Sequence, residues 1–388
     1  MLDKENIFMK INRISKLVSL CLCGLLLLAV TVGCSDQILL ESGEIVTKGQ
    51  SLATQAPTGT EAEAQTSGGG VTTPPLTVIN PGSSEGQTTA ATESVPSLSI
   101  GTQAATIPSI SIGEDPEDIF KDSESMMRVD FLNTGESDCI LLRINDKVVL
   151  VDTADGDDSQ KIKRKLQEYG ITSIDCLILT HYDNDHIGSV AALLSDFAVN
   201  EVYMPDYVRS SGLYRSAMSA INDCVDASRI HRLYGETVEL TIGGASISLN
   251  ATALYERGMT LGADGSTEGV VENNFSLMTT VTLGSARILL AGDAENDRMA
   301  EFASQLDSGY PSYMLVKTPH HGEYTKALGV CLSQSRPRYC VVCTDTKEKV
   351  EPKLETEMIG SAAYYTFNGD VCFVTDGSVA RYLIKQEK

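Results

Sequence analysis

The stretch "LTHYDNDHIGS", residues 179–189, decides how the rest of the sequence is interpreted. It follows a run of apolar residues and places His181, Asp183, Asp185 and His186 within six positions. The whole chain of 388 residues has only five histidines. Two explanations are open here. The segment is either a polar surface loop or a metal site, because imidazole and carboxylate groups are common metal ligands.

Other strand-like segments lead to the same residue types. "VVLVDT" reaches Asp152, "RILLAGD" ends at Asp293, and "YMLVKTPHHG" carries His320 and His321 after its apolar run. In layered α/β folds, sites form outside the carboxyl ends of strands. Four of the five histidines stand at such positions, and His231 is expected to be a surface or packing residue. The set of strand ends therefore favours the metal site.

The spacing indicates how two ions could share these ligands. His181 and Asp183 could bind one ion, Asp185 and His186 a second, and Asp293 could bridge both. Two ions roughly 3.5–4 Å apart hold a hydroxide nucleophile and stabilise charge on a substrate oxygen. We therefore expect a hydrolase in which Asp185 and Asp293 are catalytic.

The segment from about residue 123 to 388 is expected to form the folded domain. Strand-like apolar runs alternate there with helix-like stretches such as "DDSQKIKRKLQEYG", "IGSVAALLSDF" and "SGLYRSAMSAINDCVD". The chain closes on the strand-like segments "YYTFNGDVCFVTDG" and "SVARYLIK". Sheets flanked by helices follow from this order.

A CxxC spacing at Cys340 and Cys343 raises the alternative of a zinc or redox site. The two cysteines lie in the strand-like run "YCVVCT", and residues three apart in a strand point to opposite faces. A buried strand is therefore the favoured interpretation.

The first 34 residues are typical of a secretory signal. Four basic residues precede the apolar stretch at 17–32, which is short for a membrane span. "VTVGCS" then resembles the lipobox of bacterial lipoproteins, although Thr31 stands where leucine is usual. We expect Cys34 to be lipidated, which would place the chain on the outer face of the cytoplasmic membrane, with secretion or an uncleaved signal anchor as alternatives.

Residues 35–122 are rich in Ser, Thr, Pro and Gly and poor in apolar side chains. Such a segment cannot bury enough apolar surface to offset its conformational entropy, so a disordered linker is expected. The net charge of −22 disfavours non-specific nucleic-acid binding, which normally needs a basic surface.

"THYDNDHIGS" resembles the HxHxDH motif of the metallo-β-lactamase fold in its HxDxDH form. "DFLNTGESDCILLRINDKVVLVDT", "NNFSLMTTVTLGSARILLAGD" and "LVKTPHHG" are similar in order and spacing to the extracellular hydrolase domain of ComEC-type competence proteins. The resemblance spans roughly residues 127–386. It implies an α/β fold, specifically an αββα four-layer sandwich, with a dinuclear metal site at one edge.

The resemblance also implies roles for individual residues. The implied metal ligands are His181, Asp183, Asp185, His186, Asp293 and either His320 or His321. Asp152 would order the site, and Asn274 would lie near it. Many relatives carry another histidine before the bridging aspartate, where "VENNFSLM" stands here, so the first ion is thinly liganded. Zinc is expected first and manganese second.

Asp183 stands where many relatives have histidine, which points away from β-lactamases and lactonases and toward phosphoester chemistry. The expected substrate is a phosphodiester or related ester: DNA, a nucleotide, or a cell-wall phosphoester such as that cleaved by a surface phosphorylcholine esterase of the same architecture. A non-enzymatic surface protein that keeps the fold as a scaffold is the alternative.

Overall fold

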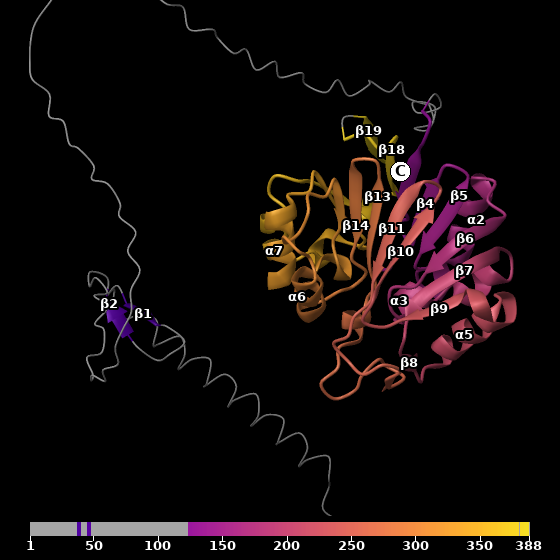
Figure 1. The fold of residues 1–388 in the computed structure, drawn as a ribbon, viewed down its shortest axis with the longest axis horizontal. Helices are drawn as coiled ribbons and strands as arrows, with labels where there is room; N and C mark the ends of the chain where they lie inside the picture. Colours follow the sequence, from indigo (N-terminus) through magenta and orange to yellow (C-terminus); the bar gives the residue numbers. More distant parts are fainter. Residues whose placement is uncertain (1–36, 40–44, 48–122, 380, 388) are drawn as a thin grey trace, which may run out of the picture. The chain divides into compact units, whose positions relative to one another are not determined.

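The computed structural model describes residues 37–39, 45–47, 123–379 and 381–387 (Figure 1). The predicted signal segment 1–34, with Cys34, lies outside them, and so does most of the predicted linker. Within the linker range, β1 (Gln37–Leu39) pairs antiparallel with β2 (Ile45–Thr47). Among the described residues, no helix combines the length and the apolar character that crossing a membrane requires.

The domain contains two large sheets, which lie face to face in Figure 1. The first has eight strands in the order β19-β18-β3-β4-β5-β6-β7-β9. Its strands are β3 (Met127–Phe131), β4 (Ile140–Ile144), β5 (Lys147–Val151), β6 (Ser173–Ile178), β7 (Ala198–Pro205), β9 (Ile230–Leu233), β18 (Val371–Thr375) and β19 (Tyr382–Gln386). Strands β5, β6, β7 and β9 run parallel, and the remaining pairs are antiparallel.

The second sheet has seven strands in the order β10-β11-β13-β14-β15-β16-β17. They are β10 (Thr237–Ile242), β11 (Ala245–Asn250), β13 (Met278–Leu283), β14 (Ala286–Leu290), β15 (Leu315–Lys317), β16 (Tyr339–Val342) and β17 (Ala362–Tyr365). Strands β14 to β17 are parallel neighbours. A small parallel pair joins β8 (Val208–Arg209) to β12 (Thr260–Leu261).

Helices cover the outer faces of both sheets (Figure 1). The first sheet carries α2 (Ser159–Glu168), α3 (Asn184–Ile187), α4 (Val190–Leu194) and α5 (Gly212–Cys224), and the second carries α6 (Asn296–Ser304), α7 (Lys326–Ser335) and α8 (Pro352–Glu357). Short 3-10 turns are η2 (Gly156–Asp158), η3 (Ala227–Arg229), η4 (Glu272–Phe275), η5 (His320–Gly322), η6 (Lys347–Lys349) and η7 (Thr366–Asn368). The expected αββα sandwich is confirmed.

Alternation along the strands divides the apolar side chains between three layers of core. In β4, Ile140 and Leu142 pack between the two sheets, whereas Leu141 faces the helices. In β14, Ile288 and Leu290 face the first sheet, and Leu289 faces α6 and α7. Strands buried on both faces read as continuous apolar runs, which is why the sequence pattern identified them.

The cysteines of the CxxC spacing lie on opposite sides of the second sheet, as expected. Cys340 packs in the core under the helices, and Cys343 in the core between the sheets. Both thiols are free and buried. A shared zinc or redox site at this spacing is therefore excluded by the strand geometry.

The predicted helix at 187–197 is instead two short helices, α3 and α4, which meet at Gly188 and Ser189. A Cβ at Gly188 would lie 2.4 Å from the Gly156 backbone nitrogen, so only glycine permits this close approach. The closing segment also divides: β17 joins the second sheet beside β16, whereas β18 returns to the first sheet beside β3.

Candidate metal centre

The loop after β6 carries the motif residues of the first sheet. His181 and His186 are completely buried, whereas about a third of each Asp183 and Asp185 side chain is exposed. The imidazoles therefore lie in the protein interior and the carboxylates lie toward solvent. The Thr153 backbone N–H donates to the His186 carbonyl at 2.7 Å, which fixes the loop against the end of β5.

The second sheet contributes the other two strand ends. Asp293 follows β14, and His321 lies in η5 just beyond β15. These strands are parallel neighbours, so their carboxyl ends meet at the same edge. Both side chains are buried.

Two donors from each sheet meet in one group, which we call the four-donor cluster: Asp185, His186, Asp293 and His321. Each offers a ligand atom within 4.8 Å of the others. The Asp293 Oδ2 atom lies 3.2 Å from His186 Nε2 and 3.1 Å from His321 Nε2. Asp185 Oδ2 lies 3.0 Å from His321 Nε2 and 3.7 Å from His186 Nε2.

In both imidazoles of the cluster, the ring nitrogen that faces away from the other ligands contacts an acceptor. His186 Nδ1 lies 2.8 Å from Asp152 Oδ2, and His321 Nδ1 lies 2.9 Å from the Cys343 carbonyl oxygen. A carbonyl and a carboxylate only accept, so each Nδ1 carries the proton and each Nε2 faces the cluster. Asp152 is itself held by the Thr180 N–H at 2.7 Å and the Thr180 hydroxyl at 2.6 Å. Such partners fix the orientation of metal-binding histidines.

The donor set fits a divalent transition metal. The buried His186 Nε2 atom makes no well-aligned hydrogen bond among the described residues, although Asp293 Oδ2 lies 3.2 Å away, so it is available to a ligand. Two imidazoles and two carboxylates suit zinc and also manganese. The ligand atoms of a second group, Asp138, Asp152 and His186, also lie within 4.8 Å of one another. These atoms already have protein partners, because Asp138 pairs with Lys317, and Asp152 pairs with Thr180 and His186.

Without an ion, protons and ion pairs balance the charges of the cluster. Burial lowers the pKa of His321, but Asp293 and Asp185 raise it more, to about 10. Burial raises the pKa of Asp185, but His186 and His321 lower it below its usual range. A bound cation would take the place of these protons.

The backbone at the site adopts uncommon conformations. Of six non-glycine residues with positive φ in the described part of the chain, four lie here: Asp152, Ala154, His320 and His321, with φ between 48° and 57°. Left-handed backbone is unfavourable for such residues and persists where the surroundings impose it. The packing around these strand ends therefore stabilises backbone conformations that are unfavourable on their own.

The implied ligands of the first ion are not members of this cluster, although the His181 ring lies beside the His186 ring, with the ring centroids 4.1 Å apart. His181 Nε2 is 3.5 Å from Asp183 Oδ2. The other Asp183 oxygen, Oδ1, accepts a hydrogen bond from the Arg209 guanidinium at 2.6 Å. His181 and Asp183 are thus neighbours, but Asp183 already has a cationic partner.

His320 and His321 separate into different roles. His320 Nδ1 lies 3.0 Å from Glu323 Oε2, and its Nε2 lies 3.2 Å from the Asn273 amide nitrogen. Asn274 points elsewhere, because its Oδ1 accepts from the Arg298 backbone N–H at 3.2 Å. Asn273, rather than Asn274, is therefore the asparagine that contacts His320.

Two buried basic residues at the site, Lys317 and Arg209, were not predicted from the sequence. Lys317 is fully buried at the end of β15, where its ammonium contacts the Asp138 carboxylate, donates to the Gly292 carbonyl at 2.9 Å and lies 3.4 Å from Asp293 Oδ1. A lysine inside the apolar run "YMLVKTP" was the available signal, because lysine is rarely buried without a partner. Arg209 stands in a segment without any recognisable pattern.

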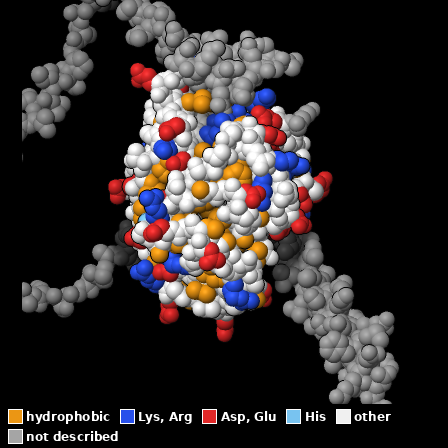
Figure 2. All heavy atoms as spheres, turned by 90° about the vertical axis from the view of Figure 1, so that its right-hand side faces the viewer, with side chains coloured by type: hydrophobic (Ala, Val, Ile, Leu, Met, Phe, Trp, Pro, Cys, Tyr) orange, Lys and Arg blue, Asp and Glu red, His pale blue; other side chains and the backbone are white. Residues whose placement is uncertain are grey.

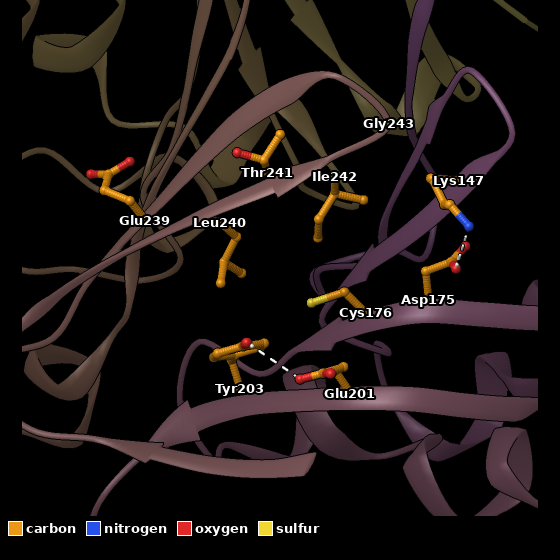
Figure 3. Close-up of a pocket in the computed structure, with 10 residues that line it drawn as sticks. All are labelled: Lys147, Asp175, Cys176, Glu201, Tyr203, Glu239, Leu240, Thr241, Ile242 and Gly243. Atoms are coloured by element: carbon orange, nitrogen blue, oxygen red, sulfur yellow. Dashed lines mark hydrogen bonds and ion pairs between the residues drawn. The ribbon is translucent and has the colours of Figure 1, made fainter.

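A cleft of about 380 Å³ opens at the cluster. It is lined by Glu136, Asp155, Asp183, Asn184, Asp185, Asn273, Asp293, His320 and His321. Another cleft, of about 410 Å³, lies between β6, β7 and β10 (Figure 3). Its lining includes Tyr203 and Glu201, whose hydroxyl and carboxylate are in contact, and none of the predicted ligands. His231 stacks on Tyr203 there, as expected of a packing residue.

A family model described as the metallo-beta-lactamase superfamily matches residues 132–343, more than half of the chain. The chain belongs to this superfamily. The match runs from the end of β3 to the end of β16 and includes every residue of the four-donor cluster. The superfamily generally comprises metal-dependent hydrolases, and the candidate Asp and His ligands are present here.

Individual relatives are more distant. Recombination protein 2 of Haemophilus influenzae is 26% identical over 225 residues, covering 57% of this chain and 24% of that protein. The chain thus spans about a quarter of the length of that relative. The metallo-beta-lactamase fold protein YhfI from Bacillus subtilis shows 14% identity and a TM-score of 0.41, covering 62% of this chain and 96% of that one. For Tm1679, a metal-dependent hydrolase of the beta-lactamase superfamily, the identity is 10% and the TM-score 0.40, with coverage of 68% and 100%.

Proposed function

We propose that the chain is a metal-dependent hydrolase of phosphodiester or related ester bonds. The observation that carries the proposal is the meeting of Asp185, His186, Asp293 and His321 at the edge of an open cleft. The imidazoles are oriented by fixed acceptors, as a preformed metal site requires.

The four-donor cluster would hold the ion, with zinc proposed first and manganese second. The chemistry that a bound divalent ion supplies is a lowered pKa of water and neutralisation of charge on a phosphoryl oxygen. Asp185 is partly exposed in the cleft, so its carboxylate is placed to accept a proton from the attacking water. Asp293 is buried and fixed by Lys317, so it holds the ligand geometry.

The rim of the cleft provides groups for binding the substrate. His320 and Asn273 both line it and lie 3.2 Å apart. The Asn273 amide nitrogen also donates to Glu295 Oε1 at 3.3 Å, so an ester or phosphoryl oxygen would accept a hydrogen bond from it by displacing one of these two partners. His320 is partly exposed, which suits a group that exchanges a proton with a leaving oxygen.

Charge favours a small or surface-bound ester over a long polyanion. The sequence carries a net charge of −22. On the face drawn in Figure 2, the described Lys and Arg side chains are interspersed with Asp and Glu and form no continuous basic surface. The cleft itself is lined by Glu136 and Asp155 beside the ligands. Similarity to part of Recombination protein 2 keeps DNA among the substrates to be tested.

Hydrolysis of bis(p-nitrophenyl) phosphate tests the proposal. Metal-free protein should be inactive and should regain activity with Zn²⁺ or Mn²⁺. Asp185→Asn should abolish this activity, whereas Asp223→Asn, an exposed carboxylate on α5, should not change it. Activity that survives Asp185→Asn would place the reaction elsewhere. Single- and double-stranded DNA, cyclic dinucleotides and phosphorylcholine esters, each with both metals, would then identify the substrate class.

We also propose that the protein is anchored outside the cytoplasmic membrane through Cys34. The support is the basic segment, the apolar stretch at 17–32 and the "VTVGCS" sequence. Cys34→Ser should release the protein from the membrane fraction. Unchanged association would favour an uncleaved signal anchor.

A further inference from the structure

The position beside His181 differs from the four-donor cluster, because protein cations already occupy the carboxylates that a second metal ion would need. The Arg209 guanidinium donates to Asp183 Oδ1 at 2.6 Å and to the Tyr182 carbonyl at 2.8 Å. It also lies 3.2 Å from Glu272 Oε2. Arg209 is only 5% exposed, so this is a buried ion-pair network rather than a surface contact.

The network is fixed at its far end as well. Glu272 begins η4, is buried, and accepts a hydrogen bond from the Tyr207 hydroxyl at 2.8 Å. That hydroxyl accepts from the Tyr182 backbone N–H at 2.7 Å. The arginine is therefore held between the motif loop and η4, and its loss would remove the cation that pairs with the buried Glu272 carboxylate and the partly exposed Asp183 carboxylate.

Asp293, the carboxylate expected to bridge two ions, also has other partners already. Asp293 Oδ2 lies against His186 and His321 of the four-donor cluster. Its other oxygen, Oδ1, lies 3.4 Å from the buried Lys317 ammonium. Beside His181, this leaves one imidazole and the Asp183 oxygen that Arg209 does not contact. Metal sites in proteins usually have three or more protein ligands.

We propose that this centre binds one divalent metal ion tightly, in the four-donor cluster, and that Arg209 supplies the second positive charge beside His181 and Asp183. The inference rests on the proposed function, because it concerns the same site. It replaces the expectation of two ions with one ion and one guanidinium. The guanidinium offsets the charge of Asp183 at the cleft, where a second ion would otherwise do so.

Metal stoichiometry tests this inference on the full-length chain. The metal-free protein is equilibrated with Mn²⁺, dialysed, and analysed by elemental analysis and by electron paramagnetic resonance. We expect close to one ion per chain and the spectrum of an isolated Mn²⁺ ion. Two ions with an exchange-coupled spectrum would overturn the inference and leave the proposed function intact. Absence of bound metal would instead overturn the proposed function.

Arg209→Gln should raise the stoichiometry to two ions, because it leaves His181, Asp183 and Glu272 without a neutralising cation. Arg257→Gln is the matched control, since that guanidinium pairs with Asp206 at the exposed surface and should leave the value at one. A value of one for Arg209→Gln would overturn the role of the arginine.

Because Arg209 is buried, its substitution could prevent folding. In that case, the metal content of Asp183→Asn tests the proposal. The wild-type ion does not depend on Asp183 under this proposal, so Asp183→Asn should retain one tightly bound ion. Loss of that ion in Asp183→Asn would overturn the proposal.

Discussion

Replacing Lys317 with methionine removes a buried charge on which two carboxylates depend. Lys317→Met keeps most of the side-chain length but removes the ammonium that contacts Asp138, which leaves that carboxylate the more distant His321 imidazole, with Nδ1 4.0 Å from Oδ1. Neither buried oxygen of Asp138 accepts another hydrogen bond in the described structure. Breaking a buried ion pair from one side costs about 3–5 kcal/mol. A domain is stabilised by about 5–15 kcal/mol, so Lys317→Met should remove a large share of the stability.

Urea unfolding of the full chain, followed by circular dichroism in a chelating buffer, measures this loss. Lys317→Met/Asp138→Asn should recover part of it, because the uncompensated carboxylate is then neutral. Added metal should reduce the loss further, since the ion neutralises Asp293 from the other side. A Lys317→Met protein within about 1 kcal/mol of the wild type would refute the claim that Lys317 compensates Asp138 and Asp293.

Three further outcomes are expected. Asp152→Asn should weaken metal affinity roughly 10–100-fold by calorimetric titration, because His186 loses the carboxylate that orients it. His321→Ala should weaken metal affinity strongly, whereas His320→Ala should change it little; equal effects would contradict the separation of the two histidines. Metal affinity should rise with pH up to about 10, because the ion must displace the proton of His321. Burial lowers the pKa of His321, but Asp293 and Asp185 raise it more, to about 10. A metal affinity that does not change between about pH 6.5 and 8.5 would contradict this prediction.

The sequence was most informative where apolar strands end. The runs before His181, Asp293 and the 320–321 pair are buried on both faces, so their composition revealed them. Parallel strands bring such ends together, and the four-donor cluster could therefore be anticipated in outline. Sheets flanked by helices followed from the same pattern, whereas the αββα sandwich was implied by the family resemblance.

The parts that could not be predicted depend on long-range pairing. Arg209 reaches Asp183 from a two-residue strand that has no periodic pattern. Lys317 looked like one polar residue in an apolar run, and only the fold places it against Asp138. Strands β17 and β18, which follow one another near the C-terminus, belong to different sheets, and the alternation of apolar residues alone does not reveal this.

The four-donor cluster draws one pair of ligands from each sheet, and Asp185 and His321 are 136 positions apart in the sequence. A metal ion bound there would act as a removable cross-link that closes a very long loop of chain. The ion binds the folded arrangement and not the unfolded chain, so removing it withdraws that stabilisation from the contact between the two sheets while leaving the hydrogen bonds within each sheet unchanged. Hydrogen exchange should then quicken first at the ends of β6, β14 and β15, where the ligands of the two sheets meet.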